Sequence, residues 1–186
     1  MTETTGGSKR AARHATWMRN SAMFYLGQRA ASEAHFRQVM LRKAARRIGE
    51  ELDEAEIACL LDETVAYCRA NGFLNDDDYA EARSAAGARR GLSRRRVGMM
   101  LDAKGIDREQ IGRALEDFDD LAAAVRLTKK RRIGAWRRDD GQPGEVDTQR
   151  EIAILARAGF PFEIAGKAVR MSLEEAEEVL FGPAEG

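Results

Sequence analysis

The sequence has little proline, few aromatic residues and no long hydrophobic run. Three prolines among 186 residues and an aromatic content of 6% weigh against a β-sheet protein and favour helices. No apolar stretch approaches the roughly 18 residues that cross a bilayer, which excludes a membrane-spanning helix. The opening segment, MTETTGGSKRAARH, lacks the hydrophobic core of a secretory signal, so we expect a cytoplasmic protein with no membrane partner.

Residues that carry catalysis or bind metals are also scarce. Cys59 and Cys68 lie too far apart along one predicted helix to form a disulfide, and we interpret both as small, reduced, buried side chains. His14 and His35 have no serine or cysteine partner in any nucleophile motif. Zinc-ligand spacing and a GxxxxGK[ST] loop are both missing. We therefore expect no enzyme, no catalytic residue, no metal or other cofactor, and no small-molecule substrate.

Charge, in contrast, is abundant and unevenly distributed. The 31 basic and 31 acidic residues cancel, but residues 1–48 hold ten Lys or Arg and only two acids, while residues 49–80 hold ten acids and one Arg. Further basic blocks cover residues 83–113 and 126–138. Such alternation is common on solvated helix faces. Three separate basic blocks nevertheless make a polyanion a reasonable partner.

Apolar residues recur at helical spacing throughout, and no segment alternates with a period of two. The pattern predicts an all-α protein of about ten short helices. Residues 1–14 and 182–186 are predicted to be disordered tails, and 139–147, with its glycines and proline, is predicted to be a loop. Helices are expected to begin at side-chain caps and to end near glycines. The predicted caps are Ser32, Asp53, Asp76 or Asp77, Ser93, Asp107, Thr148 and Ser172.

The same helix pattern repeats along the chain. An offset of 61 residues places Ser32 on Ser93, and a second offset of 55 places Thr148 on Ser93. The first offset also aligns Phe36 with Val97, Met40 with Leu101 and Lys43 with Lys104. Units this small bury their apolar faces by stacking on neighbours. We predict three tandem three-helix repeats, 15–71, 72–118 and 119–181, that form an elongated, curved array.

The central segment resembles a known family. GFLNDDDYA (72–80) and ARRGLSRRRVGMMLDAKGID (88–107) are similar to the signature of RecX regulatory proteins, and a weaker resemblance extends over about residues 17–181. We interpret the signature positions as mainly structural, with the aspartates as helix caps rather than metal ligands. They are Gly72, Leu74, Asp76, Asp77, Tyr79, Ala80, Gly91, Lys104, Gly105 and Ile106.

The resemblance implies a bacterial regulator of DNA repair, DNA recombination and the SOS response. Its partner would be the RecA recombinase or the RecA–single-stranded-DNA filament, and its main effect would be inhibition of the recombinase and its ATPase. Single- or double-stranded DNA is a further candidate partner, and a monomer is expected. The alternative from the residues alone is a stand-alone helical DNA-binding module, with the Ser93 helix as its recognition helix.

The candidate contact residues are the basic side chains of these blocks. Arg94, Arg95 and Arg96 are expected near a helix N-terminus, where the dipole disfavours positive charge, so a partner is the better explanation for them. Trp136 is either a stacking surface or a core residue. The full set is Arg42, Lys43, Arg46, Arg47, Arg89, Arg90, Arg94, Arg95, Arg96, Lys104, Lys129, Lys130, Arg131 and Arg132.

Overall fold

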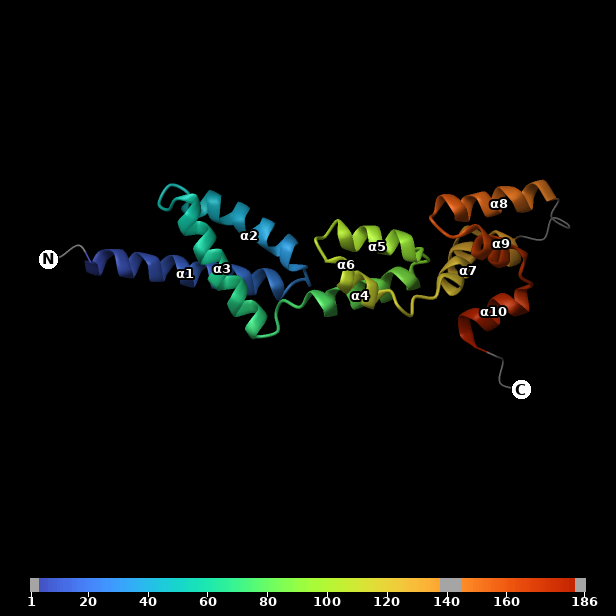
Figure 1. Cartoon of the computed structure of the whole chain (residues 1–186), viewed down its shortest axis with the longest axis horizontal. Coiled ribbons are helices and arrows are strands. Elements are labelled where there is room, and N and C mark those ends of the chain that lie inside the picture. Colours follow the sequence, from blue (N-terminus) through green and yellow to red (C-terminus); the bar gives the residue numbers. More distant parts are fainter. Residues whose placement is uncertain (1–3, 138–144, 183–186) are drawn as a thin grey trace. The chain divides into compact units, whose positions relative to one another are not determined.

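The computed structural model describes residues 4–137 and 145–182, with side chains described from residues 9 and 147 onward. Every regular element in these ranges is helical, which confirms the predicted all-α class (Figure 1). The elements are α1 (Thr4–Leu26), α2 (Glu33–Ile48), α3 (Glu54–Ala70), α4 (Asp76–Arg89), α5 (Arg94–Asp102), α6 (Arg108–Ala114), α7 (Asp120–Arg131), the 3-10 turn η1 (Gly134–Trp136), α8 (Glu145–Arg157), α9 (Phe162–Arg170) and α10 (Leu173–Phe181).

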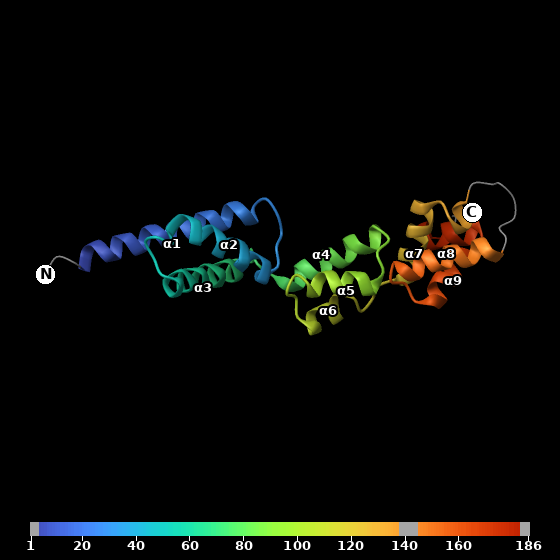
Figure 2. The ribbon, with the colours of Figure 1, turned by 90° about the horizontal axis from the view of Figure 1, so that it is seen from above.

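The chain divides into two compact units. The first contains the residues up to Tyr79 together with Lys104–Ile106, and the second contains Ala80–Ala103 and the residues from Asp107 onward. In the first unit α1, α2 and α3 lie side by side in both views (Figures 1 and 2). In the second unit α9 packs against both α7 and α8. The predicted repeat boundaries and the predicted curvature stay predictions.

Each unit has its own hydrophobic core. In the first unit Met18, Phe36 and Met40 are completely buried. In the second unit Ile152 and Leu155 of α8 are completely buried in one core with Ala123 and Ala124 of α7. The small alanine side chains let neighbouring helices approach α7 closely. Truncation of one of the large core side chains typically costs about 2–5 kcal/mol.

The prediction of a disordered tail over residues 1–14 is wrong for residues 4–14. They form the first half of α1, and His14 is only 3% exposed. Glu51, in the turn after α2, accepts a hydrogen bond from the Arg13 guanidinium at 3.0 Å and forms an ion pair with Arg10. Its carboxylate also lies 3.3 Å from His14 Nε2, although outside hydrogen-bonding geometry. The helix therefore depends on contacts with a distant turn, which a polar local sequence does not reveal.

Two other boundaries and one burial prediction also differ from expectation. The basic helix predicted over 120–138 ends at Arg131, because Arg132 adopts a left-handed conformation with φ 56°. α8 begins at Glu145, so Thr148 lies inside the helix and not at its N-cap, while residues 139–144 of the predicted loop lie outside the described residues. Cys68 is buried as expected, but Cys59 is exposed.

Neither Asp76 nor Asp77 is the N-cap residue of α4, which begins at Asp76 and is preceded by Asn75. The Asn75 side chain accepts hydrogen bonds from the backbone N–H groups of Asp77 and Asp78, at 3.0 and 3.3 Å, and so caps α4. The Asp76 carboxylate instead accepts a hydrogen bond from the Glu33 backbone N–H at 2.8 Å, at the start of α2. Asp76 thus accepts a hydrogen bond from a backbone N–H at the N-terminus of another helix, 43 residues away in sequence. For Asp76, the predicted capping role is therefore correct in kind but wrong in its target.

Ser32 and Ser93 cap their helices as predicted, and each makes one further contact. The Ser32 hydroxyl accepts a hydrogen bond from the His35 N–H and donates one to the Lys104 carbonyl, at 2.6 Å. The Ser93 hydroxyl accepts from the Arg96 N–H and donates to the Ala158 carbonyl, at 3.0 Å. Both serines are completely buried. A cap of this kind satisfies a backbone donor at one helix and a backbone acceptor at another.

The next residue after each serine completes the same arrangement. The Arg94 N–H donates to the Asp120 carboxylate at 2.7 Å, as the Glu33 N–H donates to Asp76. The accepting carbonyls of Lys104 and Ala158 are each followed by a glycine of positive φ, Gly105 and Gly159. One such arrangement lies in each unit. The contacts therefore repeat with the sequence, which supports the alignment of Ser32 with Ser93.

Because Ser93 has this double role, we expect Ser93→Ala to lower the free energy of unfolding by a large amount. The substitution removes a helix cap, worth about 1 kcal/mol, and leaves the Ala158 carbonyl without its donor, worth a further 1–3 kcal/mol or so. Ser172→Ala is the matched control, because Ser172 caps α10 from an exposed position. Urea denaturation should show a clearly larger loss of stability for Ser93→Ala, and equal losses would contradict the double role.

Candidate interaction surfaces

The helix-start arginines of α5 form an exposed basic patch in the second unit. Arg94, Arg95 and Arg96 occupy the first turn of α5, after the Ser93 cap, and all three are exposed. Arg94 is partly engaged within the protein, because its guanidinium donates to the Glu116 carbonyl at 3.4 Å. Arg89 and Arg90, at the end of α4, are also exposed. The predicted contact residues of this block are therefore available to a partner.

An open pocket of about 530 Å³ lies beside these arginines. Its charged lining comes from Arg94, Arg95 and Asp120. Its apolar lining comes from Leu115, Phe160 and Pro161, with Gly98 and Gly159 between them. The Asp120 carboxylate is already bonded to the Arg94 N–H. The pocket combines an apolar surface with guanidinium groups, which suits an acidic segment that also carries an apolar side chain.

Methionines extend the exposed surface of α5. Met99 and Met100 are 64% and 47% exposed. The spacing of Val97, Met100 and Leu101 predicts one buried face, and this prediction is wrong for Met100. Met99 and Met100 follow Arg95 and Arg96 by one helical turn, so charge and apolar surface lie together on one side of α5. Flexible, polarizable methionine side chains adapt to varied partner surfaces.

The four predicted basic residues at the end of α7 are accessible to a partner, but one of them also makes contacts within the protein. Lys129, Lys130, Arg131 and Arg132 are exposed. However, the Lys129 ammonium lies 4.4 Å from the Trp136 ring centroid and 4.8 Å from that of Phe181. These cation–π contacts connect α7, η1 and α10. Trp136 is half-buried and packs against the second core, which favours the core interpretation of this residue.

In the first unit, the predicted basic residues lie on α2 and in the segment after α5. Arg42, Arg46 and Arg47 are exposed, whereas Lys43 and Lys104 are half-buried. Lys43 lies 5.5 Å from the Tyr25 ring centroid. Lys104 is fixed beside the start of α2 by the hydrogen bond between its carbonyl and Ser32. The structure therefore brings Lys104 to α2, although 56 residues separate it from Ile48, the last residue of that helix.

Most of the signature positions are buried or lie at helix ends, and their structural role stays a prediction. Leu74, Tyr79, Ala80 and Ile106 are buried. Asp76 bonds to α2, and Asp77 belongs to the first turn of α4. Gly72, Gly91 and Gly105 have φ values of 72–77° and follow helices α3, α4 and α5.

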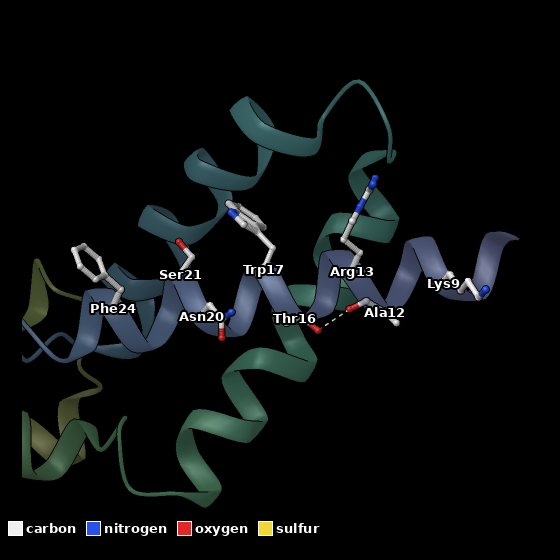
Figure 3. A pocket seen from close by; sticks show the side chains of 8 residues that line it. All are labelled: Lys9, Ala12, Arg13, Thr16, Trp17, Asn20, Ser21 and Phe24. Atoms are coloured by element: carbon white, nitrogen blue, oxygen red, sulfur yellow. Dashed lines mark hydrogen bonds between the residues drawn. The ribbon is translucent and has the colours of Figure 1, made fainter.

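A further surface lies along α1 and includes Lys9, Ala12 and Arg13 of the predicted tail. Eight residues of α1 line an open groove along one side of that helix (Figure 3). Phe24 is 67% exposed, and Lys9 and Arg13 bring positive charge to the same side. Spacing of three to four residues between the lining positions is the signal that would have found it. They are Lys9, Ala12, Arg13, Thr16, Trp17, Asn20, Ser21 and Phe24.

Neither a metal centre nor a membrane span is found in the part of the chain that the structure describes. No three His, Cys, Asp or Glu side chains there come close enough together to bind a metal ion. Among the same residues, no helix has the length and apolar character to cross a bilayer.

Comparisons with known proteins agree over most of the chain. Residues 75–115 match the family model of the RecX second three-helix domain. The chain is 37% identical over 165 residues to regulatory protein RecX of Agrobacterium fabrum, covering 89% of this chain and 88% of that one. It is 34% identical over 163 residues to regulatory protein RecX of Myxococcus xanthus, covering 83% and 84%.

Solved structures show the same fold. The crystal structure of RecX from Lactobacillus salivarius superimposes with a TM-score of 0.65 at 17% identity, covering 86% of this chain and 96% of that one. A second crystal structure, of a regulatory protein RecX, gives a TM-score of 0.66 at 18% identity, with 90% and 77% covered. The helical repeat arrangement is consistent with the RecX fold, and the sequence relatives are named as regulatory proteins rather than enzymes. With relatives above 30% identity over more than four-fifths of its length, this chain belongs to the RecX family of regulatory proteins.

Proposed function

We propose that this chain binds the RecA recombinase, or the filament that RecA forms on single-stranded DNA, and inhibits its ATPase and strand-exchange activities. Membership of the RecX family over nearly the whole chain is the observation that carries the proposal. We further propose a cytoplasmic protein that acts in DNA repair, recombination and the SOS response, without an enzymatic activity of its own.

The surface of α5 supports a protein partner. It offers exposed Arg95 and Arg96, the exposed methionines one turn later, and the pocket with apolar walls beside Arg94. Charged groups of this kind fix orientation and accelerate association, while apolar side chains provide buried area. A surface that served DNA phosphate alone would need the arginines but not the methionines.

Inhibition of RecA is the direct test. Purified protein, titrated up to an equimolar ratio, should depress the DNA-dependent ATPase activity of RecA from the same organism. Strand exchange and filament length should fall in the same range. An unchanged ATPase rate, with strand exchange and filament length also unchanged, would reject the proposal.

Charge reversal on α5 tests the surface. Arg95→Glu/Arg96→Glu should raise the protein concentration needed for half-inhibition by about tenfold or more, as loss of about 1.4 kcal/mol of binding energy implies. The helix should survive, because acids are favourable in the first turn. Arg108→Glu/Arg157→Glu is the matched control, with the same charge change at two exposed sites of the second unit. Equal effects of both variants would remove Arg95 and Arg96 from the interface.

The alternative is a stand-alone DNA-binding module, favoured by the exposed arginines at the start of α5. Such a module would bind a specific duplex tightly without RecA, with an affinity that falls steeply as salt rises. Tight, sequence-specific duplex binding combined with an unchanged RecA ATPase would support this second function.

A further inference from the structure

A group of basic side chains surrounds His35 in the first unit. We call it the His35 cluster and define it as Arg29, His35, Arg42, Lys43 and Lys104. His35 and Arg42 are seven residues apart on α2, so they lie on one face of that helix. Lys104 is brought to the first turn of α2 by the 2.6 Å hydrogen bond between its carbonyl and Ser32, the residue that caps this turn.

Tyr25 of α1 gathers two further cations of the cluster. The Arg29 guanidinium lies 5.6 Å from the Tyr25 ring centroid, and the Lys43 ammonium lies 5.5 Å from it. The ring itself packs against Phe36, with 6.2 Å between the centroids. Tyr25 is thus fixed by the core and holds one cation from the α1–α2 connection and another from α2.

The cluster has an excess of positive charge. Burial lowers the pKa of His35, and the neighbouring charges of Lys104, Arg42 and Arg29 lower it further. No carboxylate contributes to this pKa shift. Glu33, the acid nearest along the chain, is engaged by Arg37 at 2.9 Å and by Arg69. His35 is therefore neutral at pH 7, beside cations from α2, the α1–α2 connection and the segment after α5.

Converging cations without a carboxylate among them are unfavourable unless an anion binds between them. The cluster is accessible, because Arg29 and Arg42 are exposed and His35, Lys43 and Lys104 are half-buried. Guanidinium and ammonium groups donate hydrogen bonds that suit phosphate oxygens. Exposed Arg46, one turn beyond Arg42 on α2, continues the positive charge along the helix.

We propose that the His35 cluster is a binding site for the phosphodiester backbone of single-stranded nucleic acid, and that His35 takes up one proton from solvent when the strand binds. A phosphodiester brings negative charge next to the imidazole and favours its protonated form. The resulting imidazolium donates from both ring nitrogens, whereas the neutral ring donates from only one. A strand, with one charge per nucleotide, reaches Arg42 and Arg46 together, about 6 Å apart along the helix axis.

The proton uptake fixes the sign of the pH dependence. Binding raises the pKa of His35 from its lowered value, so the bound state holds more protons than the free state. The association constant therefore rises as the pH falls through the interval between the two pKa values. Uptake of one proton limits this rise to about tenfold per pH unit. The phosphodiester does not titrate between pH 6 and 8, so a slope in this range belongs to the protein.

Fluorescence anisotropy with the full chain and a single-stranded oligonucleotide, without recombinase, tests the proposal between pH 6 and 8. The wild-type affinity should rise as the pH falls, and His35→Gln should bind with little pH dependence. His14→Gln is the matched control, because His14 is the other of the two histidines in the sequence. A slope retained in His35→Gln, or lost equally in both variants, would overturn the proton uptake.

A second variant tests the site itself. Arg42→Gln should weaken binding at every pH and reduce the slope of log affinity against log salt by about 0.7 on a single strand. An unchanged salt slope would overturn the site. Competition by polyglutamate as effective as that by the oligonucleotide would also overturn it, in favour of an acidic protein. The inference does not depend on the proposed function, because no recombinase is present in these measurements.

Discussion

Replacing Arg137 with methionine should lower the free energy of unfolding by about 3 kcal/mol. Arg137, which follows η1, donates two hydrogen bonds to Glu151 of α8, at 3.0 and 2.5 Å. The Glu151 side chain is only 10% exposed, and its carboxylate also accepts a hydrogen bond from the Gly134 N–H at 3.0 Å. Without the guanidinium, a buried negative charge would keep one backbone partner and no countercharge.

Arg150→Met is the matched control for this prediction. It is the same substitution at the position next to Glu151, but the ion pair of Arg150 with Asp147 is 3.7 Å long and largely exposed. Exposed pairs contribute less than about 1 kcal/mol. Urea denaturation of the two variants should therefore differ by about 2 kcal/mol or more in their losses. Similar losses would show that Glu151 is not effectively buried.

A rescue experiment separates charge from packing. Glu151→Gln, added to Arg137→Met, removes the buried charge and keeps an oxygen acceptor for the Gly134 N–H. The double variant should recover most of the lost stability, because removing both partners of a buried pair costs far less than removing one. A double variant no more stable than Arg137→Met would assign the loss to the packing of the arginine stem.

Local signals in the sequence predict much of the fold. Ser32 and Ser93 begin helices because a short hydroxyl side chain satisfies the backbone N–H groups of a first helical turn, and this rule needs no tertiary contact. Asp53 and Ser172 cap their helices as predicted for the same reason, and each forms a capping box. The prediction that fails is the one for a segment whose structure depends on contacts with residues distant in the sequence. The first half of α1 is polar, and its contacts with Glu51 lie about 40 residues away.

The interaction surfaces likewise include features that the local sequence predicts and features that depend on distant contacts. The exposure of Arg95 and Arg96 is predictable, because charged residues in the first turn of a helix lie outside its apolar face and point to solvent. The His35 cluster is not predictable from spacing, because Lys104 reaches α2 only through the Ser32 hydrogen bond, across 72 residues. The exposure of Met100 is not predicted, for a related reason. A helix of nine residues is too short for its periodicity to separate the buried Val97 and Leu101 from Met100.

Gly105→Ala should destabilise the protein by at least about 3 kcal/mol. Gly105 has a φ of 77°, which costs a residue with a Cβ about 1–2 kcal/mol. A Cβ built there would also lie 2.4 Å from the Cβ of Ala34, in α2. Neither atom belongs to a flexible side chain, so the backbone beside the Ser32–Lys104 hydrogen bond would have to shift.

Two helical glycines, Gly87 and Gly112, separate the backbone strain from the close contact when all three variants are compared by urea denaturation. Gly87→Ala would place a Cβ 2.5 Å from Val97 Cγ2 at an ordinary helical φ, whereas Gly112→Ala meets nothing within 4 Å. Gly112→Ala should stabilise by about 0.5–1 kcal/mol, the usual helical difference between glycine and alanine. Gly87→Ala should fall between Gly112→Ala and Gly105→Ala, because the close contact opposes the same helical gain without backbone strain. If Gly105→Ala lost no more stability than Gly87→Ala, backbone strain at the positive φ of Gly105 would contribute nothing measurable. The close contact with Ala34 would then be the sole reason for a glycine at this position.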